Sequence, residues 1–495
     1  MNEIQEVIEK AEEVNEETKV NEETKVNEET AEVNKTSEGS SSSSTSYRSA
    51  RAVRLPTPPP ILRDPIFQTG KEARRISRRL FEILFYFLVY TGVMLGAYFI
   101  TRGYTSAKSR HFNPSGWYPL IMTAIGCGGF MALAWHYAVH WIPERAVLTV
   151  FWLSPLMTSA VGILLITTKS SLGLGIGIVL TVVGFAQALY HCWVASRLSY
   201  ATKIVSAATA VLPDLTTAAI LLGLATAGLH STILGFAIAG CAAMGSGWDA
   251  LAIFGFVLSL LWTQHTIKNM VQTMIARIKY NNFAKVQSIP SRWALADTIK
   301  YLVGSVALGS ILVPVFTVLR GSALALQYAF GRSDMFMYSF GWCYYHVTST
   351  LPIHGNRYGF VFSGGYNRGF LRGSRNAWQL LERSEINQLV ESDLTGSFCF
   401  FSGMTGGAAS AIVVGWWMRA THQDHVPQVV TLALLIGYLM CRIGTVWVQA
   451  SVSAYYIAYA ENPDRTQFET IRDRLLEMRR GQGLRRELEL SDRQR

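Results

Sequence analysis

Charged residues are scarce in this chain of 495 residues, because they make up 16% of it whereas hydrophobic residues make up 50%. The charges gather before residue 80, in a few short segments and at the C-terminal end. The stretches between them are apolar over about 20 residues or more, which is the length that an α-helix needs to cross a bilayer core. A soluble core does not explain so many long apolar runs, so the sequence predicts a membrane protein.

Paired cysteines and the signatures of common enzymes are also missing. The six cysteines stand singly in or beside apolar stretches, without the spacing of a disulfide framework or a zinc site. His136 and His140 lie one helical turn apart, but no nearby Glu or Cys completes a metal site. No P-loop, HExxH or GxSxG pattern occurs. We therefore expect no catalytic residue, no metal and no cofactor, and the chain is predicted not to be an enzyme.

Residues 1–79 lack the apolar side chains that a core needs. The pentapeptide Val-Asn-Glu-Glu-Thr occurs three times between Val14 and Ala31, serines fill Ser40–Ser44, and basic residues dominate from Arg48 to Arg79. Low complexity and charge predict a disordered tail, acidic first and basic next to the membrane. A regulatory, phosphorylated tail is the alternative. Since the first apolar run starts only near Leu80, we expect no cleavable signal peptide.

The apolar runs predict an all-α, polytopic membrane domain at residues 80–460, with about ten transmembrane helices, and a charged cytosolic tail at residues 461–495. The runs lie near Leu80–Ile100, Trp117–His140, Ala146–Thr167, Leu172–Trp193, Ile204–Met244, Ala250–Thr273, Tyr301–Leu319, Met335–Leu351, Ser397–Met418 and Val429–Tyr456. Five basic residues between Lys71 and Arg79 place the N-terminus in the cytosol, and an even number of spans places the C-terminus there too. The same rule explains the net charge of +10 without nucleic acid as a partner.

Several motifs follow one another from about residue 256 onward. They are, in chain order, Leu261-Trp262-Thr263-Gln264 with Asn269, Gly304-Ser305-Val306-Ala307-Leu308-Gly309-Ser310, Asn356-Arg357-Tyr358, Tyr366, Arg372, Trp378-Gln379-Leu380-Leu381 and Ala460-Glu461-Asn462-Pro463. In order and spacing they resemble the choline transporter-like family of solute carriers, and the similarity runs from the first span to about Pro463. The resemblance implies about ten spans and transport of choline or a related amine across the plasma membrane.

The chain departs from the pattern of that family at several positions, including Ala450-Ser451, Ala454 and Ala458 in place of the usual Ser-Gly, Thr and Cys. Arg277 stands where the family usually has glycine, Tyr366-Asn367-Arg368 replaces Tyr-Gly-Lys, and Asn462 replaces the final Asp. The identity of the substrate therefore has weaker support than the fold.

The aromatic and polar residues of the spans suit a quaternary ammonium ion. Such an ion has no N–H to donate, so its site needs aromatic faces and a polar group for the hydroxyl. The candidate substrate-binding residues are Trp262, Gln264, Asn269, Tyr190, Trp193, Asp214 and Tyr455. Trp262 and Asn269 share a helix face by their spacing, and Gln264 lies to one side. The alternative is that these Trp and Tyr residues anchor the helices at the membrane interface.

Asp214 has two interpretations. If its helix starts near Lys203, the carboxyl lies about 16 Å deep and acts as a counter-ion or proton carrier. If the span begins at Pro213, Asp214 is an ordinary residue at a helix N-terminus. Farther along, apolar residues among basic ones in 366–394 predict an amphipathic helix on the cytosolic face.

These features predict a secondary or facilitated transporter for a choline-like organic cation, embedded in the lipid bilayer. Two other functions remain open. The chain could be a membrane scaffold or trafficking protein without transport activity, whose tail repeats bind partners. A channel would need a continuous polar pore lining, which the sequence does not reveal.

Overall fold

The computed structural model describes residues 76–107, 114–210, 216–244, 247–284, 291–330, 343–421 and 425–480, and the statements below refer to these residues. The predicted tail at residues 1–79 and the end of the C-terminal tail lie almost entirely outside them. The described part is helical throughout and contains no strand. This confirms the all-α fold class.

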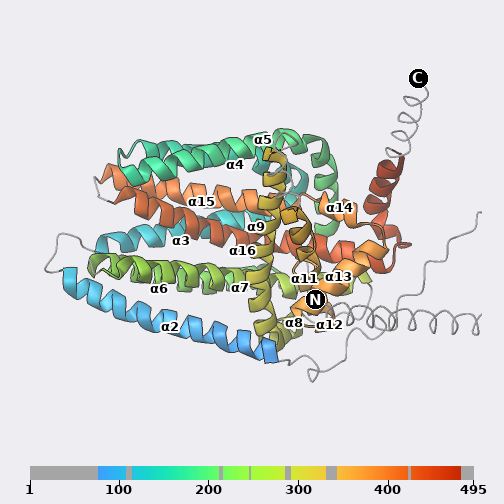
Figure 1. Ribbon diagram of the computed structural model, residues 1–495, viewed down its shortest axis with the longest axis horizontal. Helices are drawn as coiled ribbons and strands as arrows, with labels where there is room; N and C mark the ends of the chain where they lie inside the picture. Colours follow the sequence, from blue (N-terminus) through green and yellow to red (C-terminus); the bar gives the residue numbers. More distant parts are fainter. Residues whose placement is uncertain are drawn as a thin grey trace, which may run out of the picture. The chain divides into compact units, whose positions relative to one another are not determined.

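The elements follow in chain order (Figure 1). They are α2 (Ile76–Ala107), η2 (Pro114–Trp117), α3 (Tyr118–Trp141), α4 (Pro143–Ile166), α5 (Ser171–Thr209), α6 (Thr216–Met244), α7 (Asp249–Ala284), α8 (Ser291–Asp297), η3 (Thr298–Leu302), α9 (Val303–Phe330), α11 (Leu351–His354), α12 (Gly359–Tyr366), α13 (Phe370–Arg383), α14 (Asn387–Glu391), α15 (Thr395–Ala420), α16 (Val426–Glu461) and η4 (Thr466–Phe468). Residues 343–349 and 469–480 are also helical.

In the described part of the chain, nine helices are long and apolar enough to cross a membrane. Each of the nine overlaps one of the predicted apolar runs. The remaining predicted run, Met335–Leu351, falls partly outside the described residues, because 335–342 are not among them. The structure therefore confirms a polytopic membrane protein.

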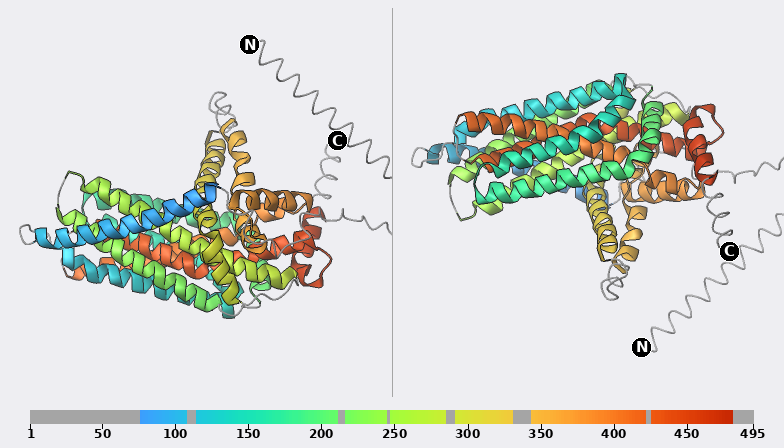
Figure 2. Two further views of the ribbon diagram at one scale, coloured as in Figure 1. Left: turned by 90° about the horizontal axis from the view of Figure 1, so that it is seen from below. Right: turned by 90° about the horizontal axis from the view of Figure 1, so that it is seen from above.

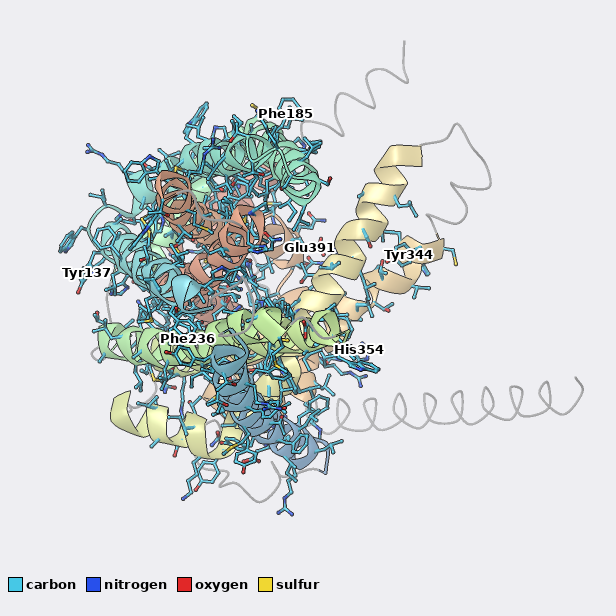
Figure 3. All side chains as sticks on the ribbon, turned by 90° about the vertical axis from the view of Figure 1, so that its left-hand side faces the viewer. Tyr137, Phe185, Phe236, Tyr344, His354 and Glu391 are labelled. Atoms are coloured by element: carbon cyan, nitrogen blue, oxygen red, sulfur yellow. The ribbon has the colours of Figure 1, made fainter. Side chains whose placement is uncertain are left out.

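Eight of these helices form a bundle with a common direction. They are α2, α3, α4, α5, α6, α7, α15 and α16, and α16 lies among the others with most of its side chains buried (Figures 1 and 2). Large apolar side chains are exposed on the outer faces of the bundle, and Phe185 is one of them (Figure 3). An apolar exterior of this kind is suited to lipid.

α9 runs across the bundle rather than along it (Figures 1 and 2). Its N-terminal part packs against the bundle, where Gly304 lies against Arg78 and Glu82 of α2, and Gly309 lies under the ring of Phe370 in α13. Its C-terminal part leaves the bundle with the helix at residues 343–349, and a 3.0 Å hydrogen bond joins Ser322 and Tyr344 (Figure 3). Tertiary contacts fix this direction, so the apolar run Tyr301–Leu319 alone did not predict it.

One predicted boundary was wrong. The run Ile204–Met244 is not one unit, because α5 continues through Lys203 and ends at Thr209, and α6 starts at Thr216. Ile204 therefore belongs to the preceding helix. Helix length explains the error, since the 39 residues of α5 extend well beyond the membrane-spanning minimum.

Short helices cover one end of the bundle. α13 lies in the predicted amphipathic segment and buries Phe370, Ala377 and Leu381, whereas Arg372 and Arg375 are exposed. The buried residues recur at helical spacing, which gives α13 one apolar face directed at the protein. The predicted amphipathic pattern is thus confirmed, whereas the position of this helix on the cytosolic face stays a prediction.

Candidate functional site

Polar side chains meet in the interior of the bundle, midway along α7 and α16. On α7, His265, Lys268 and Gln272 follow at intervals of three and four residues, so they share one helix face. Lys268 is 8% exposed and Gln272 is 1% exposed. At 1.5 Å per residue, Lys268 lies about 24 Å from the nearer end of its helix. An ionisable side chain at this depth is costly and marks a functional site by default.

α16 and α15 contribute the other side of this region. Arg442, Thr445 and Gln449 repeat the same spacing on α16. The hydroxyl of Ser402 on α15 donates to Thr445 over 3.3 Å, and the thiol of Cys399 donates to the Thr445 carbonyl over 3.6 Å.

Lys268 links the two sides. It interacts electrostatically with Arg442 on α16 and with Cys399 on α15. We call the region formed by His265, Lys268, Gln272, Arg442, Thr445, Gln449, Cys399 and Ser402 the central seam.

Several polar atoms of the central seam have no protein partner. Both amide atoms of Gln272, Oε1 of Gln449, Nδ1 of His265 and Nε of Arg442 are buried and make no hydrogen bond within the described part of the chain. Burying such a group unpaired costs about 1–3 kcal/mol, so native proteins rarely keep several together without a function. These atoms of the central seam are therefore available for hydrogen bonds with a bound solute or with water.

The ionisable groups of the central seam include two basic side chains, Lys268 and Arg442. None of the Asp and Glu side chains in the described ranges lies within ion-pair distance of Lys268 or Arg442. Nearby, Arg442 packs against Gly403 of α15 together with the ring of Tyr438, and that ring lies 6.1 Å from Phe400. The same small region thus combines two cationic groups with aromatic faces.

Two networks of buried acids lie toward the end of the bundle at which α7 and α16 terminate. The carboxylate of Glu461 accepts hydrogen bonds from Tyr280, over 2.6 Å, and from Tyr366. The carboxylate of Asp393 accepts from Arg357 and, over 2.7 Å, from Thr395. We call these two networks the end latch. The first network joins α7 and α12 to the end of α16. The second joins the loop before α12 to the start of α15.

Burial and neighbouring charges shift the pKa values of this end latch. Burial raises the pKa of Tyr366, and the Glu461 carboxylate raises it further. Burial also raises the pKa of Tyr358 to about 12, although Arg357 opposes the shift. For Arg357 burial alone would lower the pKa, but Tyr358 and Asp393 more than offset it, so its pKa is raised. Arg357 therefore stays charged and the two tyrosines stay neutral under physiological conditions.

A separate polar cavity of about 320 Å³ lies between α4, α5 and the helix at residues 469–480. Its lining includes the acids Glu144, Asp473 and Glu477 and the bases Lys203 and Arg474. No group of three His, Cys, Asp or Glu side chains in the described ranges is arranged to hold a metal ion.

The structure separates the residues proposed around Trp262. Trp262 donates its indole N–H to the Ala307 carbonyl of α9 over 3.1 Å, and Asn269 donates to Ser310 of α9 over 2.8 Å. Their shared face, inferred from spacing, is therefore directed at α9. Gln264 instead bonds to Ala227 and Ser231 of α6. These three side chains make helix contacts, and they do not surround one common space.

The other aromatic candidates lie elsewhere. Tyr190 shares a 2.7 Å hydrogen bond with Ser397 of α15, whereas Trp193 is 64% exposed and carries Arg197 over its ring. Trp193 fits the alternative of an interfacial anchor. The hydroxyl of Tyr455 donates to the Gln467 carbonyl, and its ring packs against Phe468.

Asp214 lies outside the described residues. The deep placement assumed a helix that starts near Lys203, and this assumption is wrong because Lys203 lies inside α5. Asp214 instead falls between the end of α5 and the start of α6.

The sequence analysis overlooked Lys268 and Arg442. Both stand inside predicted apolar runs, at Ala250–Thr273 and Val429–Tyr456, and this position alone could have identified them. Their proximity was not readable, because they come from helices far apart in the chain.

Comparison with known proteins agrees with the helical architecture and the motifs. The family described as plasma-membrane choline transporter matches residues 178–464, which is more than half of the chain. Curated relatives named Protein PNS1 are 22% identical in Yarrowia lipolytica, over 46% of this chain and 43% of the relative, and 24% identical in Mycosarcoma maydis, over 45% of each. In each case the chain spans less than half the length of the relative. The matched region contains the central seam and the end latch, and the chain belongs to the plasma-membrane choline transporter family.

Proposed function

We propose that the protein is a secondary or facilitated transporter that carries a small choline-like ammonium compound across the plasma membrane. In this proposal both termini are cytosolic, and the protein catalyses no chemical reaction and needs no cofactor. The observation that carries the proposal is the central seam, because Gln272 is buried with neither amide atom bonded in the described part of the chain, and Lys268, one turn before it, is buried too.

The position of the central seam supports transport. Transporters commonly bind their substrates near the bilayer midplane, between helices that rearrange around the site. Lys268 and Arg442 lie near the middle of helices of 36 residues each. A polar site at this depth can exchange a solute with both sides when the helices move.

The aromatic rings beside the central seam support an ammonium group in the substrate. Tyr438 lies next to Arg442 across Gly403, and the ring of Phe400 lies beside that of Tyr438. Aromatic faces attract ammonium groups by about 0.5–2 kcal/mol each. Tyr438 thus replaces Trp262 and Trp193 as the ring that we expect to face substrate.

The end latch supports a barrier at one end of the pathway. Arg357, Asp393 and Glu461 hold the helix ends together through buried charged hydrogen bonds. Alternating access requires that one end is closed while the other is open. A channel has no need of such a closure during conduction.

Two other functions remain as outcomes of the test. A membrane scaffold or trafficking protein does not need unpartnered polar groups in the middle of its bundle, and no feature of the central seam favours one. A channel would conduct without saturation.

The experiment is the uptake of radiolabelled ammonium compounds, with choline as reference, by proteoliposomes that contain the full chain. The proposal predicts uptake that exceeds that of protein-free liposomes and saturates with concentration. Uptake without saturation would favour a channel. No uptake of any ammonium compound would overturn the proposal and leave a scaffold role.

A further inference from the structure

The central seam contains two basic side chains, Lys268 and Arg442, that differ in their partners from Lys279, Arg277 and Arg357. Lys279 donates to the Ala208 carbonyl over 2.9 Å, Arg277 pairs with Asp297 at 3.1 Å, and Arg357 pairs with Asp393. Lys268 and Arg442 have no such bond or ion pair in the part of the chain that the structure describes. They also lie within electrostatic reach of each other. These two basic side chains thus have no counter-ion in the described part of the chain.

We infer that the central seam binds organic zwitterions, in which an anionic carboxylate or phosphate accompanies the ammonium group. This inference rests on the proposed function, because it specifies the substrate class of the same site. It goes beyond a simple cation such as choline. A cation alone would face Lys268 and Arg442 with like charge, which disfavours its binding in a region of low dielectric constant.

The chemistry of the two side chains fits an anionic group. A guanidinium presents N–H donors in a planar fork that matches a carboxylate or a phosphate, and an ammonium group adds a point charge. Nε of Arg442 is buried without a partner in the described part of the chain, and Lys268 on the neighbouring α7 interacts electrostatically with Arg442. The amide of Gln272, one turn beyond Lys268, is unbonded at both its nitrogen and its oxygen. An anion between these groups would satisfy donors from α7 and α16 at once.

The ammonium end of the zwitterion would lie against the aromatic rings. Tyr438 stands one helical turn before Arg442, and both pack over Gly403, where a Cβ would lie 2.9 Å from either side chain. Phe400 extends the aromatic surface on α15. This arrangement places a cationic clamp and an aromatic face side by side, as a compound with both groups requires.

The inference has an electrical consequence. When no ion is co-transported, a zwitterion of zero net charge moves no charge across the membrane, so its entry is independent of the membrane potential. Entry of a monovalent cation is favoured by about 2.3 kcal/mol per 100 mV, which corresponds to a factor of about 50. The dependence of uptake on potential therefore separates the two substrate classes.

The experiment compares three labelled compounds in proteoliposomes that contain the full chain. They are choline, trimethylglycine and phosphocholine, which share the trimethylammonium group and carry no anionic group, a carboxylate and a phosphate, respectively. The inference predicts that at least one zwitterion is taken up faster than choline. For trimethylglycine it also predicts uptake that does not respond to an imposed potential.

Variants of the central seam test its residues. Lys268→Met and Arg442→Gln should lower the ratio of zwitterion to choline uptake by at least about tenfold. Each variant leaves the anionic group of the bound zwitterion without one of its cationic partners, which is costly in a buried site. Lys268→Arg, which keeps the charge, should retain more of that ratio. The matched control is Lys279→Met, since Lys279 is a buried lysine of the same helix whose amine already has a partner. It should leave the ratio unchanged.

Binding is measured separately as the shift in melting temperature of the purified protein in detergent. The zwitterion should stabilise the wild type and should not stabilise Lys268→Met. If a zwitterion stabilises the protein but no compound is taken up, the proposed transport function fails and the inference stands. If choline is taken up while neither zwitterion binds or competes, the inference fails and transport stands.

Two further results would overturn the inference without relying on any variant. One is a preference of the wild type for choline over both zwitterions. The other is equal stabilisation by inorganic phosphate and phosphocholine, because the ligand would then need no ammonium group. Absence of both binding and uptake for all compounds would overturn the inference and the proposed function together.

Discussion

The guanidinium of Arg357 is paired with the carboxylate of Asp393, and that carboxylate is completely shielded from solvent. Asp393 precedes α15 and also accepts hydrogen bonds from the backbone N–H and the hydroxyl of Thr395. Arg357 reaches the hydroxyl of Tyr358 over 2.8 Å as well. The pair therefore connects the segment before α12 to the start of α15.

Removing one charge of this pair should be strongly destabilising. Asp393→Asn leaves Arg357 buried without a counter-ion, and we expect a loss of about 3–5 kcal/mol of unfolding free energy. The matched control is Glu391→Gln, because Glu391 pairs with Arg320 at 2.9 Å but is 45% exposed. Glu391→Gln should lower the free energy of unfolding by less than about 1 kcal/mol. Thermal unfolding in detergent checks both, and equal losses would contradict the role given to the buried pair.

Tyr358 should make the protein sensitive to alkali. Its pKa in the folded protein is raised by burial to about 12 from an ordinary value of 10.0. The unfolded chain therefore loses this proton first, so stability is complete below pH 10 and declines as pH rises from 10 to 12. Tyr358→Phe should flatten that part of the profile by up to about 1.4 kcal/mol per pH unit. Melting temperatures between pH 8 and 11 test this, and parallel profiles for both proteins would contradict it.

The contact between α2 and α6 depends on two glycines. A Cβ on Gly103 would lie 2.5 Å from the backbone of Gly240, and a Cβ on Gly240 would lie 2.3 Å from the Phe99 carbonyl oxygen. Gly240→Ala should thus separate the helices and cost about 1–3 kcal/mol. Gly126→Ala is the control, because no atom lies within 4 Å of its added Cβ. It should be neutral or stabilising by up to about 1 kcal/mol, and the same cost at both positions would refute this packing.

Variants of two glutamines of α7 distinguish a role in substrate binding at the central seam from a role in helix packing. Gln264→Met removes two 2.8 Å hydrogen bonds to α6 and should cost about 1–3 kcal/mol in stability, with uptake per folded molecule retained. Gln272→Met removes an amide without a protein partner, so it should cost little stability and lower uptake. Uptake and melting temperature are measured for both variants. Wild-type uptake in Gln272→Met would place the substrate away from this part of the bundle.

The membrane helices were predictable because their signal is local. An apolar run of sufficient length specifies a span whatever its neighbours are, and nine runs correspond to membrane-length helices in the described part of the chain. The direction of α9 was not predictable, since it depends on contacts such as that of Gly309 with Phe370. The boundary at Thr209 was missed because α5 continues beyond the length that the membrane requires.

The candidate site was predicted less well than the fold. The sequence favoured Trp262 because aromatic residues suit an ammonium ion, but the indole N–H bonds to Ala307 and the residue packs between α2 and α9. The same segment contains Lys268, whose importance depends on Arg442 of α16. Helical spacing shows which residues share a face, as for Trp262 and Asn269, but it does not show which helix that face meets.

The most direct test of transport is a counterflow measurement in proteoliposomes. Vesicles are loaded with an unlabelled ammonium compound that the protein takes up, and the entry of the labelled compound is followed at a low outside concentration. A carrier that alternates between the two sides exchanges one molecule for another, so the account predicts faster and larger transient accumulation than in unloaded vesicles. Entry that is the same in loaded, unloaded and protein-free vesicles would contradict it.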